Sequence, residues 1–146
     1  MIITWATKAE LKIVASLSKM FAEENCCNGI VAQNENYFKN QKVIVAKEDN
    51  KIIGYAYGNI ETALKNRCYI NKGDIIFYLE EIYVIPNKRN LHVGEKLFRF
   101  LESYAKEQNA KAMEVSAVSK DYNRLLDFYI NKLKMTFFSA FLYKTI

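Results

Sequence analysis

Residues 78–97 gather more groups able to do chemistry than any other part of the chain. Two adjacent carboxylates, Glu80 and Glu81, lie in an apolar stretch, and two cations, Lys88 and Arg89, follow it. A helical pattern begins directly after these cations. The start of a helix offers main-chain N–H groups without partners and the positive end of the helix dipole. The sequence therefore predicts a site for a phosphate-bearing ligand, with a carboxylate able to accept a proton close by.

The elements that position these groups form a strand, a turn and a helix. Residues 75–85 are expected to form a long strand that ends at Pro86, because proline has no N–H to donate to a sheet. Apolar residues then recur at helical spacing over 92–108. A further strand is expected over 111–118. A strand, a helix and a second strand in this order predict a right-handed crossover between parallel strands.

The rest of the chain predicts a mixed α/β sheet with the element order β-α-α-β-β-β-α-β-α-β. Thr7 and Glu10 have the spacing of a capping box at the start of the first helix. The remaining elements are a strand, two helices, a hairpin of two strands, a late helix and a final extended segment rich in Phe and Tyr. They are expected over residues 2–6, 7–24, 33–39, 42–46, 52–60, 121–133 and 136–144.

Composition limits the class of protein. The chain has 146 residues, of which 51% are hydrophobic and 25% charged, and this predicts a single globular domain over residues 1–146. No run approaches the roughly 20 apolar residues of a membrane span, and the N-terminus has no signal-peptide pattern. The net charge is +5, but the lysines are spread along the chain, so a nucleic-acid partner is not expected.

The cysteines and the one histidine argue against disulfides and metals. Cys26, Cys27 and Cys68 are odd in number and include an adjacent pair, which is no disulfide framework and fits a reducing, cytoplasmic location. There is no CxxC pattern, and His92 is the only histidine. We therefore expect no zinc site and no other metal centre.

The loop between the long strand and its helix carries a recognisable motif. Val84, Pro86, Arg89 and Gly94 match V-x-P-x-x-[RQ]-x-x-G-x-[GA], and in this the chain resembles the GNAT superfamily of N-acetyltransferases. The resemblance implies a GNAT-like α/β fold, with a central mixed sheet of six to seven strands flanked by about four helices. It also implies acetyl-CoA as cosubstrate. His92 replaces the first glycine of the motif, and we expect it to be tolerated because histidine is enriched at positive φ.

The resemblance further implies which residues hold acetyl-CoA. Main-chain amides of the loop would bind its pyrophosphate, and the end of the strand would pair with its pantetheine arm like an added β-strand. The cofactor-binding residues implied in this way are Ile82, Tyr83, Val84, Arg89, Asn90, Leu91, His92, Val93, Gly94, Glu95 and Asn123.

The catalytic base is expected on the strand. The run around Glu80 resembles the Leu-Glu-Asp strand of polyamine-type members of the family, where Glu80 occupies the position of the base. Side chains alternate along a strand, which places Glu80 and Glu81 on opposite faces. On this pattern only one of the two glutamates can serve the same site.

The acid that meets the leaving thiolate is expected on the late helix. Tyr129 follows Phe128 as in the family's Asn-x-x-Ala-x-x-Phe-Tyr helix, but its spacing from Asn123 is one residue short. Matching the Phe-Tyr pair makes Tyr129 the acid. Matching Asn123 instead puts Ile130 at that position and Tyr129 in the core, and both registers stay open.

The expected function is therefore transfer of an acetyl group from acetyl-CoA to a primary amine of a small molecule or peptide, by direct attack in a ternary complex. Glu61, Asp74, Glu80 and Glu81 could form an acidic rim, which favours a cationic acceptor. The alternative is a non-catalytic acyl-CoA-binding sensor or interaction domain on the same fold. The aromatic C-terminal segment could also pair across a homodimer.

Overall fold

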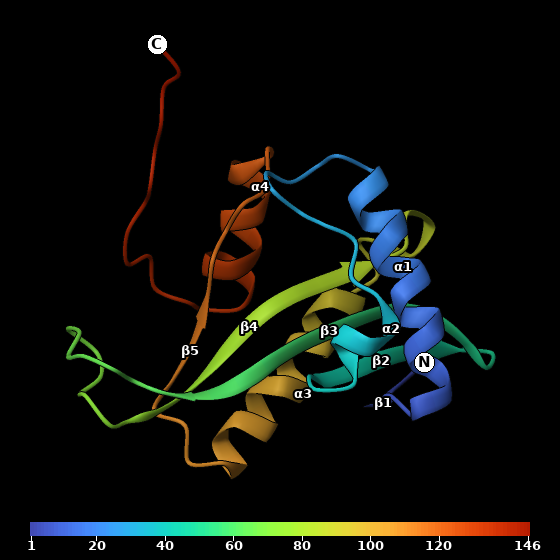
Figure 1. Cartoon of the computed structure of the whole chain (residues 1–146), viewed down its shortest axis with the longest axis horizontal. Helices are drawn as coiled ribbons and strands as arrows, with labels where there is room; N and C mark the ends of the chain where they lie inside the picture. The colour runs from blue at the N-terminus through green and yellow to red at the C-terminus, as the bar shows by residue number, and fades with distance from the viewer.

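The fold is built on one mixed sheet of five strands, in the order β1-β2-β3-β4-β5 (Figure 1). It is seen in a computed structural model that describes all residues, 1–146. The first four strands are antiparallel neighbours, and β4 and β5 are parallel, as the crossover pattern predicts. The strands are β1 (Ile2–Trp5), β2 (Lys42–Glu48), β3 (Lys51–Thr62), β4 (Ile75–Val84) and β5 (Ala112–Val115).

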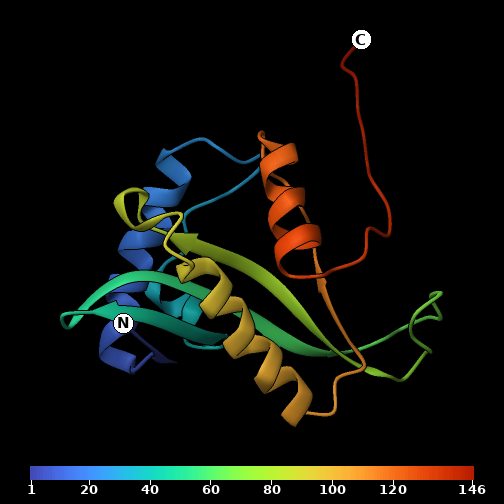
Figure 2. The same cartoon turned by 180° about the vertical axis from the view of Figure 1, so that it is seen from behind.

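Helices cover both faces of the sheet. Helices α1 and α2 lie on one face and α3 lies on the other, as Figure 1 and the reverse view in Figure 2 show. The helices are α1 (Leu11–Glu23), α2 (Glu35–Phe38), α3 (Val93–Glu107) and α4 (Tyr122–Leu126), with short 3-10 turns η1 (Lys8–Glu10) and η2 (Pro86–Lys88) and a π-helical turn η3 (Asp127–Lys132). The capping box of Thr7 and Glu10 is confirmed. None of these helices has both the length and the apolar character needed to cross a membrane.

Two predictions about the sheet are wrong. It has five strands rather than six to seven, and residues 136–144 form no strand. Leu133, just after η3, is still buried, and the chain from residue 136 onward extends away from the rest of the protein (Figures 1 and 2). The apolar pattern of this segment is strand-like, but a strand exists only beside a neighbour that completes its hydrogen bonds, and none lies beside it.

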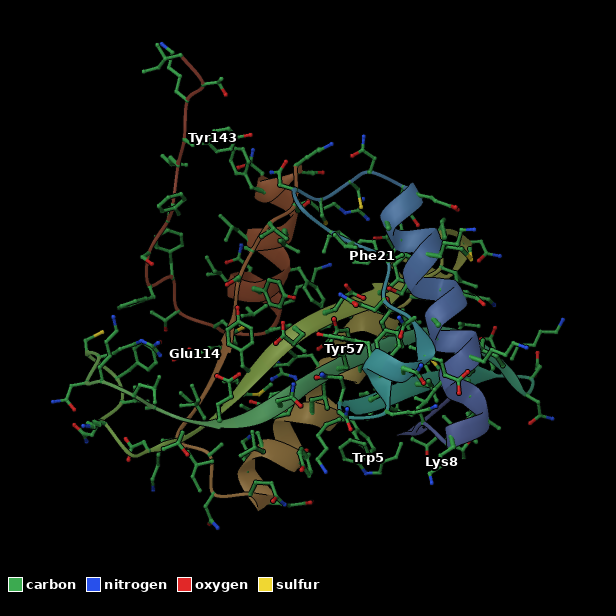
Figure 3. The ribbon with its side chains drawn as sticks, in the orientation of Figure 1. Trp5, Lys8, Phe21, Tyr57, Glu114 and Tyr143 are labelled. Atoms are coloured by element: carbon green, nitrogen blue, oxygen red, sulfur yellow. The ribbon has the colours of Figure 1, made fainter.

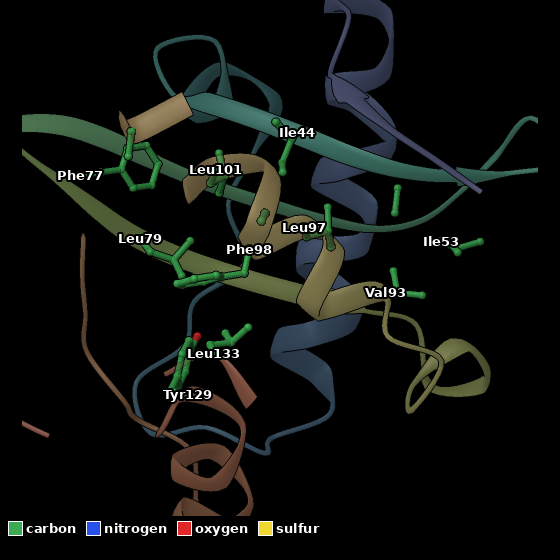
Figure 4. Close-up of a cluster of buried hydrophobic side chains, with 13 residues drawn as sticks. Ile44, Ile53, Phe77, Leu79, Val93, Leu97, Phe98, Leu101, Tyr129 and Leu133 are labelled. Carbon is green, nitrogen blue, oxygen red and sulfur yellow. The ribbon is translucent and has the colours of Figure 1, made fainter. Parts of the chain in front are cut away.

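The two faces of the sheet carry separate hydrophobic cores. On the α3 side, Leu97 and Leu101 pack against Phe77 and Leu79 of β4, and Figure 4 shows this cluster. On the α1 side, a second cluster consists of Leu11, Val14, Leu17, Phe38, Val43, Val45, Tyr55, Tyr57 and Tyr83. Residues of β4 contribute to both cores. The core in which a β4 side chain lies therefore shows which face of the sheet that side chain is on.

Strand β4 contains a β-bulge at Glu80. Tyr57 of β3 pairs with Glu81 and the next residue, Gly58, pairs with Leu79, so Glu80 has no residue opposite it. Before the bulge Phe77 and Leu79 face α3, whereas after it Tyr83 faces α1. The one extra residue exchanges the faces to which odd and even positions point. Glu80 and Glu81 therefore both face α1, and the expectation that they lie on opposite faces is wrong.

Replacing Gly58 by alanine should destabilise the protein, because the bulge brings β4 too close for a side chain. A Cβ atom at this position would lie 2.3 Å from the carbonyl oxygen of Tyr78 and 2.7 Å from the ring of Phe77. We expect the free energy of unfolding in urea to fall by about 2–3 kcal/mol.

The matched control is Gly29→Ala. Gly29 has a φ of +75° but no atom within 4 Å of its would-be Cβ, so only backbone strain of about 1 kcal/mol is expected. Equal losses in the two variants would contradict the close approach at Gly58.

Candidate functional site

The sheet opens along the C-terminal half of β4. Strand β5 pairs only with residues 76–79, so residues 80–84 have β3 on one side and no strand on the other. The N–H of Ile85 donates to Ile53 of β3. Alternation of the ladder then directs the main-chain groups of Ile82 and Val84 toward the open side and those of Tyr83 toward β3. An extended ligand could add to this edge through Ile82 and Val84.

The loop between β4 and α3 presents amides at the end of this open edge. Asn90 and His92 adopt φ of +62° and +59°, so the tolerance of histidine at positive φ is confirmed. The N–H groups of Asn90, Leu91 and His92 donate to no protein atom. The first amides of α3, from Val93 onward, lack partners as at any helix start. Together they form a run of unpartnered donors suited to an anion.

The cations of the loop are turned away from these amides. The Nη2 of Arg89 donates to both carboxylate oxygens of Glu24, at 2.7 and 2.8 Å, and its Nε donates to the carbonyl of Val84 at 2.8 Å. Its guanidinium also lies 5.5 Å from the ring centroid of Tyr83. Lys88 pairs with Glu48. A side-chain grip of Arg89 on a phosphate would require breaking its ion pair.

A cation from α4 reaches the loop instead. The Nη2 of Arg124 donates to the Oδ1 of Asn90 at 3.0 Å. Asn123, expected beside the cofactor, is exposed on the same short helix, and its neighbour Arg124 makes the contact. The sequence analysis missed Arg124 because nothing in a lone arginine on a short helix shows that it meets a distant loop.

Gly94 lies where three elements converge. A Cβ atom on Gly94 would meet the ring of Phe128 at 3.4 Å and the side chain of Ile82 at 3.9 Å. Val93 is buried in the α3 core, and Glu95 in the first turn of α3 lies 3.1 Å from the Nδ1 of His92. The small residue at position 94 thus lets α3 start close to the open edge of β4.

Two carboxylates lie on the α1 side of the same strand segment. Glu81 is only 8% exposed, and the hydroxyl of Tyr55 donates to its Oε1. Burial raises the pKa of Glu81 to about 7, the Tyr55 hydrogen bond opposes this rise, and the charge of Glu80 adds to it. Glu80 itself is exposed, and partial burial and the charge of Glu61 raise its pKa.

Tyr129 lies inside the protein. It is 8% exposed and lies beside Phe98, at a ring-centroid distance of 6.5 Å (Figure 4). The ring centroid of Phe128 lies 5.2 Å from that of Tyr129. Burial, with a smaller contribution from Cys27, raises the pKa of its hydroxyl. The phenol is therefore held in its protonated form.

Two main-chain hydrogen bonds connect the loop after α1 with the loop after β5. The N–H of Asn28 donates to Val118 at 2.8 Å, and the N–H of Lys120 donates to Cys26 at 2.9 Å. The segment after α1 is thereby joined to the segment after β5.

Burial raises the pKa of the Cys27 thiol to about 12, so this cysteine is an unreactive thiol at neutral pH. No three His, Cys, Asp or Glu side chains gather as metal ligands.

The family is shown by comparison with known proteins. A family model described as "Acetyltransferase (GNAT) family" matches residues 12–134, and the chain belongs to this family. No curated protein sequence matches the chain. Many solved structures match the fold of this chain. Their sequence identities to it are low, so these matches are evidence for the fold and not for a shared function.

Three of these structures cover nearly the whole chain. The tetramutant of BH1408 protein from Bacillus halodurans has a TM-score of 0.79 at 20% identity and covers 100% of both chains. A predicted acetyltransferase with acetyl-CoA from Clostridium acetobutylicum has a TM-score of 0.76 at 19% identity and covers 99% of this chain and 95% of its own. The aminoglycoside acetyltransferase meta-AAC0020 from an uncultured soil sample, in complex with sisomicin, has a TM-score of 0.71 at 20% identity, with coverage of 99% and 95%.

Replacing Glu24 by glutamine should loosen the loop before α3. The change removes the charge that holds Arg89, and we expect the free energy of unfolding to fall by about 1–2 kcal/mol. Hydrogen exchange of the Lys88 and Arg89 amides, which donate to Ile85 and Pro86, should become faster. The control is Glu23→Gln, whose side chain is 64% exposed and lies 3.8 Å from Lys19. This control should lower the free energy of unfolding by less than about 0.5 kcal/mol. Equal effects of the two changes would refute the role of the Glu24–Arg89 ion pair in holding the loop.

The raised pKa of Glu81 predicts how stability depends on pH. Its pKa rises from 4.5 in the unfolded chain to about 7 in the folded one, so ionising it costs stability above pH 4.5, fully so above pH 7. The native protein should lose about 2–3 kcal/mol between pH 5 and pH 8 that the Glu81→Gln variant does not lose. Urea unfolding at the two pH values measures this, and parallel changes in both proteins would contradict it.

Proposed function

We propose that the protein transfers an acetyl group from acetyl-CoA to a primary amine of a small molecule or peptide, in a ternary complex. The observation that carries this proposal is the continuity of three features. The open edge of β4 leads to a loop of unpartnered amides at one end, and two carboxylates stand on the α1 side of the same segment. Family membership and neighbours named with acetyl-CoA or CoA support the choice of cosubstrate.

The residues present fit the two polar parts of acetyl-CoA. Amides from Asn90 to Glu95 and the guanidinium of Arg124 would face the pyrophosphate. Ile82 and the N–H of Val84 offer main-chain groups for a pantetheine arm, since the carbonyl of Val84 already accepts from Arg89. Arg89 would act by fixing the loop to α1 rather than by touching the phosphate. When bound, the cosubstrate supplies an activated acetyl thioester.

Glu80 is the proposed base. An ammonium acceptor must lose a proton before its nitrogen can attack, and a carboxylate of raised pKa beside it accepts that proton. Glu80 is exposed on the α1 side and is therefore accessible to an acceptor. Glu81 is buried and accepts a hydrogen bond from the hydroxyl of Tyr55. Glu81, whose pKa is raised to about 7, is partly ionised at neutral pH and stays the second candidate for the role.

Tyr129 is the proposed acid for the leaving thiolate. Its raised pKa keeps the phenol protonated at neutral pH, which an acid requires. Its burial is that of the register in which Ile130 takes the acid position, so Tyr129 meets the thiolate only where the thioester sulfur reaches into η3. Water can supply the same proton, and activity does not depend on this residue alone.

The acceptor is proposed to be a small cation. Glu61, Glu80 and Glu81 lie on the same side of the sheet, and Tyr57 of that side is close enough for the two strand glutamates to raise its pKa. Carboxylates and aromatic faces together favour ammonium groups. Two neighbours named as aminoglycoside acetyltransferases support a small-molecule amine with several positive charges.

The test is acetyl-CoA binding followed by turnover. Calorimetry should detect acetyl-CoA binding to the native protein, and a thiol-release assay with polyamines and aminoglycosides should detect acetyl transfer. Glu80→Gln should lower kcat by about 100-fold or more while acetyl-CoA affinity stays unchanged, because the carboxylate acts on the acceptor alone.

Glu61→Gln is the matched control, since it removes a neighbouring carboxylate without removing the base. It should raise KM for the acceptor and leave kcat within about threefold. Loss of kcat in Glu81→Gln with normal turnover in Glu80→Gln would move the base to Glu81. Binding without turnover of any amine would favour the acyl-CoA sensor, and absence of binding would refute both functions.

A further inference from the structure

Cys26 and Cys27 are adjacent cysteines whose sulfur atoms lie together in the loop after α1. The two Sγ atoms are 3.9 Å apart, and both free thiols are partly exposed. Figure 1 shows this loop running from the end of α1 across to α4, and Figure 3 shows Phe21 in the last turn of α1, where the loop begins. Neither thiol has a role in the proposed reaction.

The fold holds the two sulfur atoms on one side of the chain. Successive side chains of an extended segment point in opposite directions, so contact between neighbours requires a turned main chain. The carbonyl of Cys26 accepts from the N–H of Lys120 at 2.9 Å, and the N–H of Asn28 donates to Val118 at 2.8 Å. These hydrogen bonds fix the main chain on both sides of Cys27, so the sulfur pair is set before any ligand binds.

The separation and number of the sulfur atoms select the kind of ligand. Soft elements bind thiols, but a structural zinc ion needs four ligands, and no three His, Cys, Asp or Glu side chains gather here. A linear two-coordinate ion with metal–sulfur bonds of about 2.3 Å, as for zinc, would hold its sulfurs about 4.6 Å apart. The observed 3.9 Å is shorter. Trivalent arsenic suits the pair, because its bonds to two sulfur atoms are bent and it needs no further protein ligand.

We propose that Cys26 and Cys27 form a binding site for trivalent arsenic compounds that carry two exchangeable hydroxyl groups. Each thiol displaces one hydroxide from arsenic. A sulfur–arsenic bond forms, an arsenic–oxygen bond breaks, and the thiol proton leaves with the hydroxide as water, so no atom is oxidised or reduced. The first bond makes the second one intramolecular, which strengthens binding by about 100-fold or more over a single thiol.

The protonated state of Cys27 favours this reaction over binding of a metal cation. Burial raises the pKa of its thiol to about 12, so the thiol keeps its proton at neutral pH. A metal cation must expel that proton into solution, whereas the hydroxide on arsenic accepts it. The product carries no charge, which suits a partly buried position. Cys27 is a poor nucleophile alone, but it closes the second bond within a complex that Cys26 has already formed.

The pair lies close to groups of the candidate site. The charges of Glu81 and Glu24 contribute to the raised pKa of Cys27, and Cys27 contributes to that of Tyr129. A bound arsenic group would therefore lie near all three side chains. Any loss of acetyl transfer on binding would rest on the proposed function, whereas the binding itself does not, and the test measures binding.

Phenylarsine oxide, whose hydrated form carries two hydroxyl groups, is the probe. In an excess of a monothiol, which removes arsenic held by one sulfur, the native protein should bind one probe per chain. Mass spectrometry should show the gain of one phenylarsenic group and the loss of two hydrogens. Cys26→Ser and Cys27→Ser should each weaken binding by about 100-fold or more. The matched control is Cys68→Ser, which removes the exposed third cysteine and should bind as the native protein does.

Urea unfolding separates a site made by the fold from adjacency in the sequence. A pair that the fold holds ready binds the probe better than the unfolded chain does, so the midpoint of unfolding should rise with probe concentration. A midpoint that does not rise would overturn the proposal, because adjacency alone would then explain the binding. So would the absence of binding to the native protein, unchanged binding in either Cys26→Ser or Cys27→Ser, or loss of binding in Cys68→Ser.

Discussion

The β-bulge at Glu80 is the constraint on which the rest of the site depends. One extra residue in β4 turns the next side chains over, so that two adjacent glutamates face α1 while Ile82 and Val84 face α3. The bulge also lies where β4 loses its pairing with β5, since the parallel ladder ends at Leu79. A single local irregularity therefore separates the side that would bind an acceptor from the edge that would bind an extended thioester.

A second interaction joins these two sides. Arg89 belongs to the loop that starts α3, and Glu24 follows the end of α1, yet the Nη2 of Arg89 pairs with both carboxylate oxygens of Glu24. The hydroxyl of Tyr83, on β4, donates to the same Glu24 carboxylate at 2.7 Å. Helix α1, strand β4 and the loop before α3 thus share the Glu24 carboxylate, so a movement of α1 would displace the loop.

Local patterns made most of the fold predictable. The capping box at Thr7, the proline that ends β4 and the helical spacing of α3 each depend on neighbours in sequence, and each is confirmed. The faces of Glu80 and Glu81 could not be predicted. A bulge depends on how β3 pairs with β4, and it is not visible in the pattern of apolar and polar residues along β4. The pairs Arg89–Glu24 and Arg124–Asn90 join residues 65 and 34 positions apart, and no local pattern encodes them.

The pairing of its cations changes how the loop can hold an anion. Lys88 and Arg89 suggest a site that attracts phosphate by charge, but Glu48 and Glu24 neutralise both. What remains beside Arg124 of α4 is geometry: two left-handed residues, Asn90 and His92, and a helix start that leave neighbouring amides without partners. Charge attracts any anion at a distance, whereas aimed amides act only on an oxygen in contact with them. The loop is therefore better described as a main-chain site whose shape is fixed by its basic side chains than as a basic patch.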